Sequence, residues 1–176
     1  DPLIPGLYFV KEISAPAGYI LDDTYYPVTV NIGQENGKAT ITIYNGRMPY
    51  RIQVLKIDGR DGETGLPGAT FELREAVQNI QDPQAPMVGD LLEVLTTDSN
   101  GEALTINLYL PGSYFLVETA APAGFRLIAD PILITIDIGS GTDGIFSVSV
   151  TNEFIYTPGI SVEKLVANDS QSDPLS

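Results

Sequence analysis

Two stretches of the sequence, SYFLVETAAPAGF at residues 113–125 and LYFVKEISAPAGY at residues 7–19, decide how the chain is organised. Both contain Tyr-Phe, a glutamate four residues after the tyrosine, and Ala-Pro-Ala-Gly followed by an aromatic residue. The two glutamates, Glu12 and Glu118, lie 106 residues apart. Because self-similarity at a fixed period is the signature of a repeated unit, we predict a repeat of about this length.

Other pairs of segments keep nearly the same spacing, at 107 and 108 residues. They are ITIYN (41–45) with VSVTN (148–152), and RIQVLK (51–56) with GISVEK (159–164). These matches predict that residues 1–48 are the C-terminal part of an upstream repeat and that residues 49–156 are a complete repeat. Residues 157–176 are then expected to be the first strand of a following repeat.

The composition excludes several kinds of site. The 176 residues include no cysteine and no histidine, so disulfides, thiol nucleophiles, Ser/His/Asp triads and Cys- or His-based metal sites are ruled out. We expect no cofactor and no metal. A net charge of −14 disfavours nucleic acid and anionic membranes as partners. No apolar run is long enough to span a bilayer and no signal peptide is evident, so either the protein is cytosolic or its targeting segments lie outside this sequence.

Strands dominate the predicted secondary structure. Alternation of apolar and polar residues recurs in short segments, and Asn-Gly or Asp-Gly turn pairs separate many of them. Residues 75–95, which contain Pro83 and Pro86, are less regular and are expected to hold a loop or one short helix. The pattern favours an all-β, Ig-like β-sandwich. The predicted strands are 26–32, 39–45, 50–57, 69–74, 104–110, 113–119, 132–138 and 145–152.

Three predicted strands carry a polar residue at the end of an apolar stripe. Successive strand residues point to opposite faces, so Lys56 shares a face with Ile52 and Val54. By the same rule, Glu118 and Asn152 continue the apolar faces of their own strands. The partial repeats place the same residue types at equivalent positions, namely Glu12, Asn45 and Lys164.

A buried amine, carboxyl and carboxamide must pair, and they can also react. Burial favours the uncharged forms of amines and carboxylic acids. A neutral Lys56 amine is a nucleophile, the Asn152 carboxamide is an electrophile, and Glu118 could act as general acid and base. The alternative from spacing alone is a Lys56 side chain that snorkels to water, a Glu118 that forms its salt bridge, and an Asn152 that forms a turn. Asn45-Gly46 is likewise a natural turn pair.

The stretch from Tyr114 to Phe125 resembles the E-box of collagen-adhesin B-type (Cna B-type) repeats, which are prealbumin-like sandwiches of Gram-positive surface adhesins and pilins. LPGATFEL (66–73) and TTDSNG (96–101) look like two further segments of that family. The resemblance implies an isopeptide bond between Lys56 and Asn152, with Glu118 catalytic. In the partial repeats it implies the equivalents Glu12, Asn45 and Lys164, whose partners are absent. Phe125 replaces the usual final tyrosine of the motif.

The resemblance implies a structural stalk or shaft repeat of a secreted protein located at the cell surface or cell wall. Its chemistry would be one self-cross-linking step without turnover, and its partners would be neighbouring repeats. The alternatives are an adhesin module that binds a host extracellular-matrix protein or glycan, and an accessory domain of a secreted enzyme. Tyr25, Tyr26 and Tyr44 are candidates for such a binding patch. The acidic run 58–63 does not have the spacing of a calcium loop, and a solvated hairpin is expected there.

Overall fold

The computed structural model describes residues 3–32, 38–156 and 159, and these residues form strands, turns and loops without a helix. The all-β prediction is therefore confirmed. No helix able to cross a membrane occurs in the part of the chain described. The strands are β1 (Gly6–Val10), β2 (Tyr26–Val30), β3 (Arg51–Asp58), β4 (Thr70–Val77), β5 (Met87–Thr96), β6 (Glu102–Leu104), β7 (Gly112–Ala120), β8 (Ile132–Ile136) and β9 (Ile145–Asn152).

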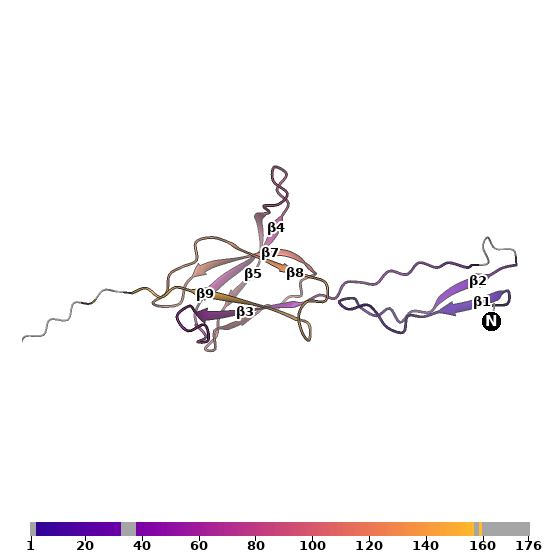
Figure 1. Ribbon diagram of the computed structural model, residues 1–176, viewed down its shortest axis with the longest axis horizontal. Coiled ribbons are helices and arrows are strands. Elements are labelled where there is room, and N and C mark those ends of the chain that lie inside the picture. Colours follow the sequence, from indigo (N-terminus) through magenta and orange to yellow (C-terminus); the bar gives the residue numbers. More distant parts are fainter. Residues whose placement is uncertain (1–2, 33–37, 157–158, 160–176) are drawn as a thin grey trace, which may run out of the picture.

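The strands from β3 to β9 build one sandwich, which we call the body. One sheet has the order β6-β3-β9 and the other the order β5-β4-β7-β8. β3 and β9 are parallel neighbours, whereas the other pairs are antiparallel. β1 and β2 form a separate hairpin at one end of the long axis (Figure 1). We call the described residues before the body, 3–32 and 38–48, the hairpin unit. The chain is thus elongated, with the hairpin unit and the body in line.

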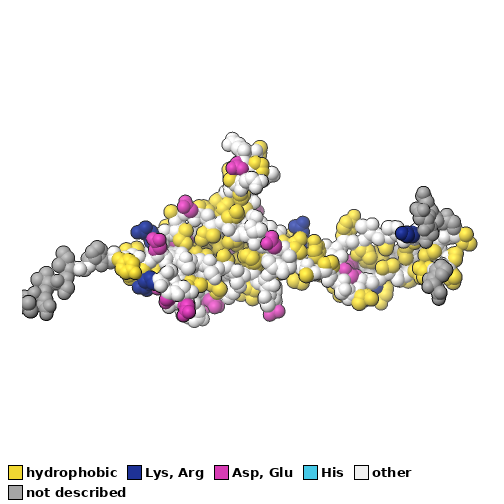
Figure 2. Space-filling view, viewed as in Figure 1, with side chains coloured by type: hydrophobic (Ala, Val, Ile, Leu, Met, Phe, Trp, Pro, Cys, Tyr) yellow, Lys and Arg dark blue, Asp and Glu magenta, His cyan; other side chains and the backbone are white. Residues whose placement is uncertain are grey.

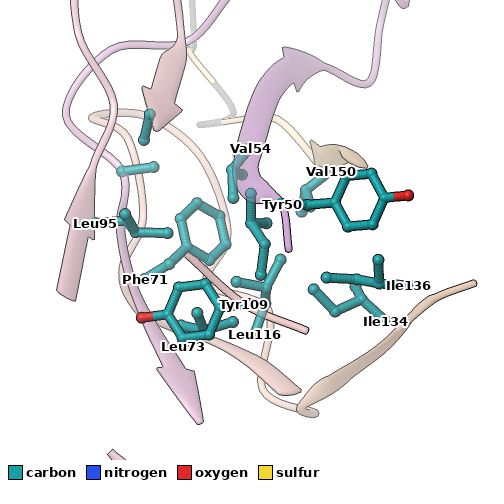
Figure 3. Close-up of a cluster of buried hydrophobic side chains, with 13 residues drawn as sticks. Tyr50, Val54, Phe71, Leu73, Leu95, Tyr109, Leu116, Ile134, Ile136 and Val150 are labelled. Carbon is teal, nitrogen blue, oxygen red and sulfur yellow. The ribbon is translucent and has the colours of Figure 1, made fainter. Parts of the chain in front are cut away.

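Alternating apolar residues place the core between the two sheets of the body. On β3, every second residue from Ile52 to Asp58 is buried, as expected for a strand with one face inward. Val54 and Val150 come from one sheet, and Phe71 and Leu116 from the other (Figure 3). The largest fully buried apolar side chains in the described part of the chain are Ile52, Val54, Phe71, Leu73, Leu116 and Ile136.

The hairpin unit repeats one part of the body. Gly6 pairs with Val30 across β1 and β2, and Gly112 pairs with Ile136 across β7 and β8, so the register is preserved at a shift of 106 residues. The strand predicted at 39–45 is wrong, however, because residues 38–45 form no strand. In the body, the equivalent strand β9 pairs with β3. The described residues before Arg51 include no counterpart of β3, so residues 38–45 have no ladder partner among them.

Two other expectations are corrected. The region expected to be a loop or short helix contains the ten-residue strand β5, and only the tip of the β4–β5 hairpin is irregular. Register shifts near Arg74 break the alternation, which hides the strand from a period-two search. The strand predicted at 104–110 is also wrong, because the strand here is β6, Glu102–Leu104, and beyond it the Glu93 carboxylate accepts the N–H groups of Ile106 and Asn107 in place of a ladder.

Turn chemistry agrees with the sequence at the β8–β9 connection. Asp143 (φ 51°) and Gly144 (φ 76°) both adopt the left-handed conformation, and Thr142 and Ile145 bond across them. This geometry is typical of an Asp-Gly hairpin turn. Another of the Asn-Gly pairs expected to form turns, Asn36-Gly37, lies outside the described residues, as does Lys164.

Candidate cross-link site

Lys56 is completely buried on the inner face of β3, the middle strand of its sheet. Both of its backbone polar groups are bonded, since its N–H donates to Gly101 O at 2.7 Å and its carbonyl accepts from Leu66 N at 2.8 Å. Gly101 has a φ of +78°, and a Cβ there would lie 2.5 Å from the Lys56 carbonyl oxygen. Glycine at position 101 therefore fixes where the Lys56 side chain enters the core.

Asn152 ends β9, and its side chain lies beside that of Lys56. Lys56 pairs with Val150 in the parallel register, so Asn152 lies two residues further along on the same face. Asn152 is 2% exposed, and the Lys56 amine donates a hydrogen bond to its Oδ1. The backbone carbonyl of Asn152 also accepts from Gly59 N at 3.1 Å. Both strands thus deliver their polar side chain to one point.

Glu118 reaches this point from the opposite sheet. Its Oε1 lies 3.3 Å from the Lys56 amine, and both carboxyl oxygens accept from Asn152 Nδ2 at 3.0 Å. A fourth contact comes from the Ile128 N–H, which donates to Oε2 at 2.8 Å. The three side chains come from β3, β7 and β9, so the cluster joins the two sheets. No buried side-chain polar atom in the described part of the chain is left without a partner.

Burial controls the electrostatics of the cluster. It lowers the pKa of Lys56 below its ordinary value of 10.5, and the charge and hydrogen bond of Glu118 oppose that shift. The ring of Phe71, which is fully buried, lies 5.5 Å from the amine and shields it from water. The uncharged form of the Lys56 amine is therefore more populated here than it would be in solvent.

The hairpin unit holds two of the three groups in the same arrangement. Asn45 Nδ2 donates to Glu12 Oε2 at 2.7 Å, and the Asp22 N–H donates to the same oxygen at 2.9 Å. The ten-residue step from Glu12 to Asp22 matches the step from Glu118 to Ile128. None of the described lysines forms an ion pair with Glu12. The unit is therefore a carboxyl–carboxamide pair without an amine.

The burial of Lys56 and Asn152 excludes two of the alternatives considered from the sequence. A lysine with no exposed surface does not snorkel, and Asn152 lies in a strand and not in a turn. Asn45 also does not form the left-handed turn, because its side chain binds Glu12 and the φ of Gly46 is not positive. The ion pair between Lys56 and Glu118 is present.

The weaker candidates have ordinary structural roles. Asp58 pairs with Arg60 at 2.6 Å, and Asp61 accepts the N–H groups of Glu63 and Thr64, as in a solvated hairpin. No group of three acidic side chains able to hold a metal occurs among the described residues. Tyr25 and Tyr44 are exposed, whereas the Tyr26 hydroxyl binds the Asp22 carboxylate, so these tyrosines do not form one uniform patch.

Sequence reasoning missed three contributors to the site. The Ile128 N–H is a backbone group and has no side-chain signature, although the repeated spacing after the Ala-Pro-Ala-Gly turn signals it in retrospect. Phe71 faces Glu118 across β4 and β7, a pairing that depends on the sheet order. Gly101 belongs to an Asn-Gly pair that predicts only a turn, and its contact with Lys56 comes from the packing of remote segments.

Comparison with known proteins agrees with this architecture. Residues 1–47 and 50–153 match the SpaA family of prealbumin-like fold domains. The chain belongs to this family. The expected likeness to B-type, prealbumin-like repeats is thereby confirmed. No curated protein sequence matches the chain.

Solved structures resemble this SpaA-family chain over part of their own length. The Bacillus anthracis TIE protein is 29% identical with a TM-score of 0.54, covering 87% of this chain and 26% of that one. A streptococcal ancillary pilin is 27% identical with a TM-score of 0.43, covering 87% and 43%. The group B streptococcus pilus 2b backbone protein is 24% identical with a TM-score of 0.48, covering 73% and 49%. The chain therefore spans between about a quarter and a half of these proteins.

Proposed function

We propose that this chain is a stalk segment of a Gram-positive cell-surface adhesin or pilus-like protein, and that its complete repeat, residues 49–156, locks itself with a Lys56–Asn152 isopeptide bond. One observation carries the proposal: an amine, a carboxamide and a carboxyl from three strands are in contact inside a sandwich core. Membership in the SpaA family supports the surface setting. Residues 1–48 and 157–176 are parts of the neighbouring repeats.

The reaction is an amide exchange in which atoms balance. Glu118 takes a proton from Lys56 Nζ, and the neutral amine attacks Asn152 Cγ. Glu118 returns that proton to the Asn152 nitrogen as the Cγ–Nδ2 bond breaks and ammonia leaves. Glu118 then accepts the second proton from Nζ, so the products are one secondary amide, one ammonia and a protonated Glu118. No oxidant, cofactor or external energy source is needed.

The core environment favours this step and limits it to one turnover. The fold holds the three groups in contact, so the reaction does not carry the entropy cost of bringing separate reactants together. Burial keeps a larger share of the amine uncharged, and Phe71 excludes the water that would compete with it. Because the product stays in the chain, each molecule reacts once and is not an enzyme in the usual sense.

The position of the bond suits a protein that carries load. The chain enters the body at the start of β3 and leaves it after β9, and these two strands are parallel neighbours. Pulling on the ends would shear the two strands past one another. A bond from Lys56 to Asn152 carries the force directly from β3 to the exit, so the residues between them are bypassed.

The bond would also replace the disulfides that the chain lacks. Lys56 and Asn152 are 96 positions apart, and closing a loop of this size stabilises the folded state by about 4–5 kcal/mol on the loop-entropy model. This is a large share of the ~5–15 kcal/mol that a native domain typically has.

Intact-mass spectrometry of the whole chain tests the proposal. The mass is expected to be lower than that of the sequence by one ammonia, and Glu118→Ala is expected to restore the sequence mass. Glu12→Ala is the matched control, because it removes the equivalent carboxyl from the hairpin unit, where none of the described lysines pairs with Glu12, so it should keep the deficit. A wild-type chain at full sequence mass would refute the bond.

A further inference from the structure

Two glycine turns join the hairpin unit to the body. Gly18, in the Ala-Pro-Ala-Gly turn, has a φ of +80°, and a Cβ there would lie 2.4 Å from the backbone nitrogen of Gly139 and 2.6 Å from Cγ2 of Ile138. Gly139 lies in the turn after β8 and also has a positive φ, of +81°. Only a residue without a side chain fits this contact on the hairpin side. It lies at the narrow waist between the two units (Figure 1).

The peptide that links the units is bound to both turns. Met48 N donates to Gly18 O at 2.8 Å, which fixes the linker to the hairpin unit. Tyr50 is 3% exposed, and its hydroxyl accepts from Gly139 N at 3.1 Å, which fixes the linker to the body. The joint therefore consists of three segments in contact, namely the Gly18 turn, the Gly139 turn and the linker between the units. It is not a flexible linker.

The opposite end of the body has the same construction as the hairpin side of the joint. Gly124 is equivalent to Gly18 and has a φ of +85°, and Ile155 N donates to its carbonyl at 2.8 Å, as Met48 does to Gly18. A Cβ on Gly124 would meet only Cε2 of Phe154, at 3.5 Å. The neighbour that covers Gly18 thus has no counterpart over Gly124 among the described residues.

The surface beside Gly124 is open and exposes apolar side chains next to charged ones. A groove of roughly 430 Å³ lies there, and among its lining residues Ile155 is 49% and Tyr156 is 76% exposed, with Arg126 and Glu153 beside them. The Arg60 guanidinium stacks on the ring of Phe154 at 4.1 Å and walls one side. Figure 2 shows this apolar patch flanked by basic side chains at the end of the body away from the hairpin unit.

We propose that this end of the body, centred on Gly124, Phe154 and Tyr156, is the docking surface for a further copy of the repeat. The turn of that copy equivalent to Ile138–Gly139 packs against Gly124 as it does against Gly18 here. The same patch pairs with the same turn at every step, so successive repeats adopt one fixed orientation and form a stiff rod. This inference concerns the joint and does not depend on the isopeptide bond.

Disulfide trapping tests the joint in a chain that has no cysteine of its own. A Cβ on Gly139 would lie 3.8 Å from that of Ala17, which is the usual separation in a disulfide. The pair Ala17→Cys/Gly139→Cys should therefore close under mild oxidation in the chain of residues 1–176. This pair calibrates the conditions for the second step.

The second step uses the chain to Tyr156 followed by an added copy of residues 50–156. Ala123→Cys in the first body and Gly139→Cys in the added copy should close under the same conditions. As a control, Ala123→Cys and Gly139→Cys placed in the same body should stay reduced. The two turns lie at opposite ends of the eight-residue strand β3, about 25 Å apart. Closure of the calibrating pair without closure of the tandem pair would overturn the proposal.

Backbone relaxation by NMR gives a readout that needs no cysteine. In the extended chain, the hairpin unit, the first body and the added copy should tumble as one particle. Gly124→Ala should release the added copy alone, and Gly18→Ala should release the hairpin unit alone. Both substitutions carry the same cost of a side chain at positive φ. Release of a different unit by each variant therefore reports the loss of the contact at that glycine. Independent tumbling of the added copy in the unmutated chain would also contradict the proposal.

Discussion

Lys56 and Asn152 are 96 positions apart in the sequence, yet the amine of the first donates a hydrogen bond to the carboxamide oxygen of the second inside the core. The parallel pairing of β3 with β9 produces this contact, and Glu118 completes it from the opposite sheet. Because the two residues belong to the first and last strands of the body, a bond between them encloses almost the whole repeat. Four predictions follow from this arrangement.

Glu118→Gln is expected to keep the shape of the site but to abolish the bond. The amide can still contact Asn152, but it cannot accept the proton from Lys56. The free energy of unfolding in urea should fall by about 4–5 kcal/mol, the loop-entropy contribution of the bond. Glu12→Gln should change it much less. Equal stability of Glu118→Gln and the wild type would contradict a stabilising cross-link.

The stability of Glu118→Gln should rise with pH in the alkaline range. Burial lowers the pKa of Lys56 in the folded state, and both opposing effects come from Glu118, which this variant lacks. Between the folded pKa and the unfolded value of 10.5, the unfolded state therefore binds more protons. Unfolding free energies measured across this range should increase, and adding Lys56→Met should remove the slope. A slope that persists without Lys56 would assign the effect to another group.

Pulling on single molecules should distinguish the bonded from the unbonded repeat. In the wild type, the bond bypasses the segment between Lys56 and Asn152, so no large extension step should come from the body. In Glu118→Ala, the same segment should unravel and add roughly 300 Å of contour length. The measurement is force spectroscopy on the chain held at both ends. A step of this size in the wild type would exclude a complete cross-link.

Gly101→Ala should slow formation of the bond, although Gly101 is not one of the three reacting residues. Its new Cβ would lie 2.5 Å from both the Lys56 carbonyl and the Leu66 nitrogen, so β3 must shift, and the cost should exceed that of the positive φ alone. Gly62→Ala is the matched control, since Gly62 has a φ of +72° with nothing within 4 Å, and it should lose only about 1–2 kcal/mol. Slower loss of ammonia from newly synthesised chains, followed by intact mass after cell-free translation, should be seen only for Gly101→Ala.

The inward-facing residues of the site were predictable because they depend on local geometry. Successive strand residues alternate between faces, so Lys56, Glu118 and Asn152 could each be assigned to the core face of their own strand. The repeated spacing added the equivalents Glu12 and Asn45, and the structure finds these two in contact. Lys164 lies outside the described residues, so its equivalence stays a prediction.

The parts that were not predictable depend on which remote segments meet. β5 was hidden because register shifts interrupt its alternation, and residues 38–45 follow a strand pattern but have no strand to pair with. The Ile128 N–H on Glu118 and the contact of Gly18 with Gly139 involve backbone atoms, which leave no trace in side-chain patterns.

The sequence by itself determined the repeat, the all-β class and the face on which each polar residue of the site lies, because these follow from spacing along one chain. Only the tertiary structure decided that β3 and β9 are parallel neighbours, and that the three polar groups meet at one point. Pairing of strands is a contact between distant segments, and its free energy depends on both sheets packing together. No single stretch of sequence contains that information.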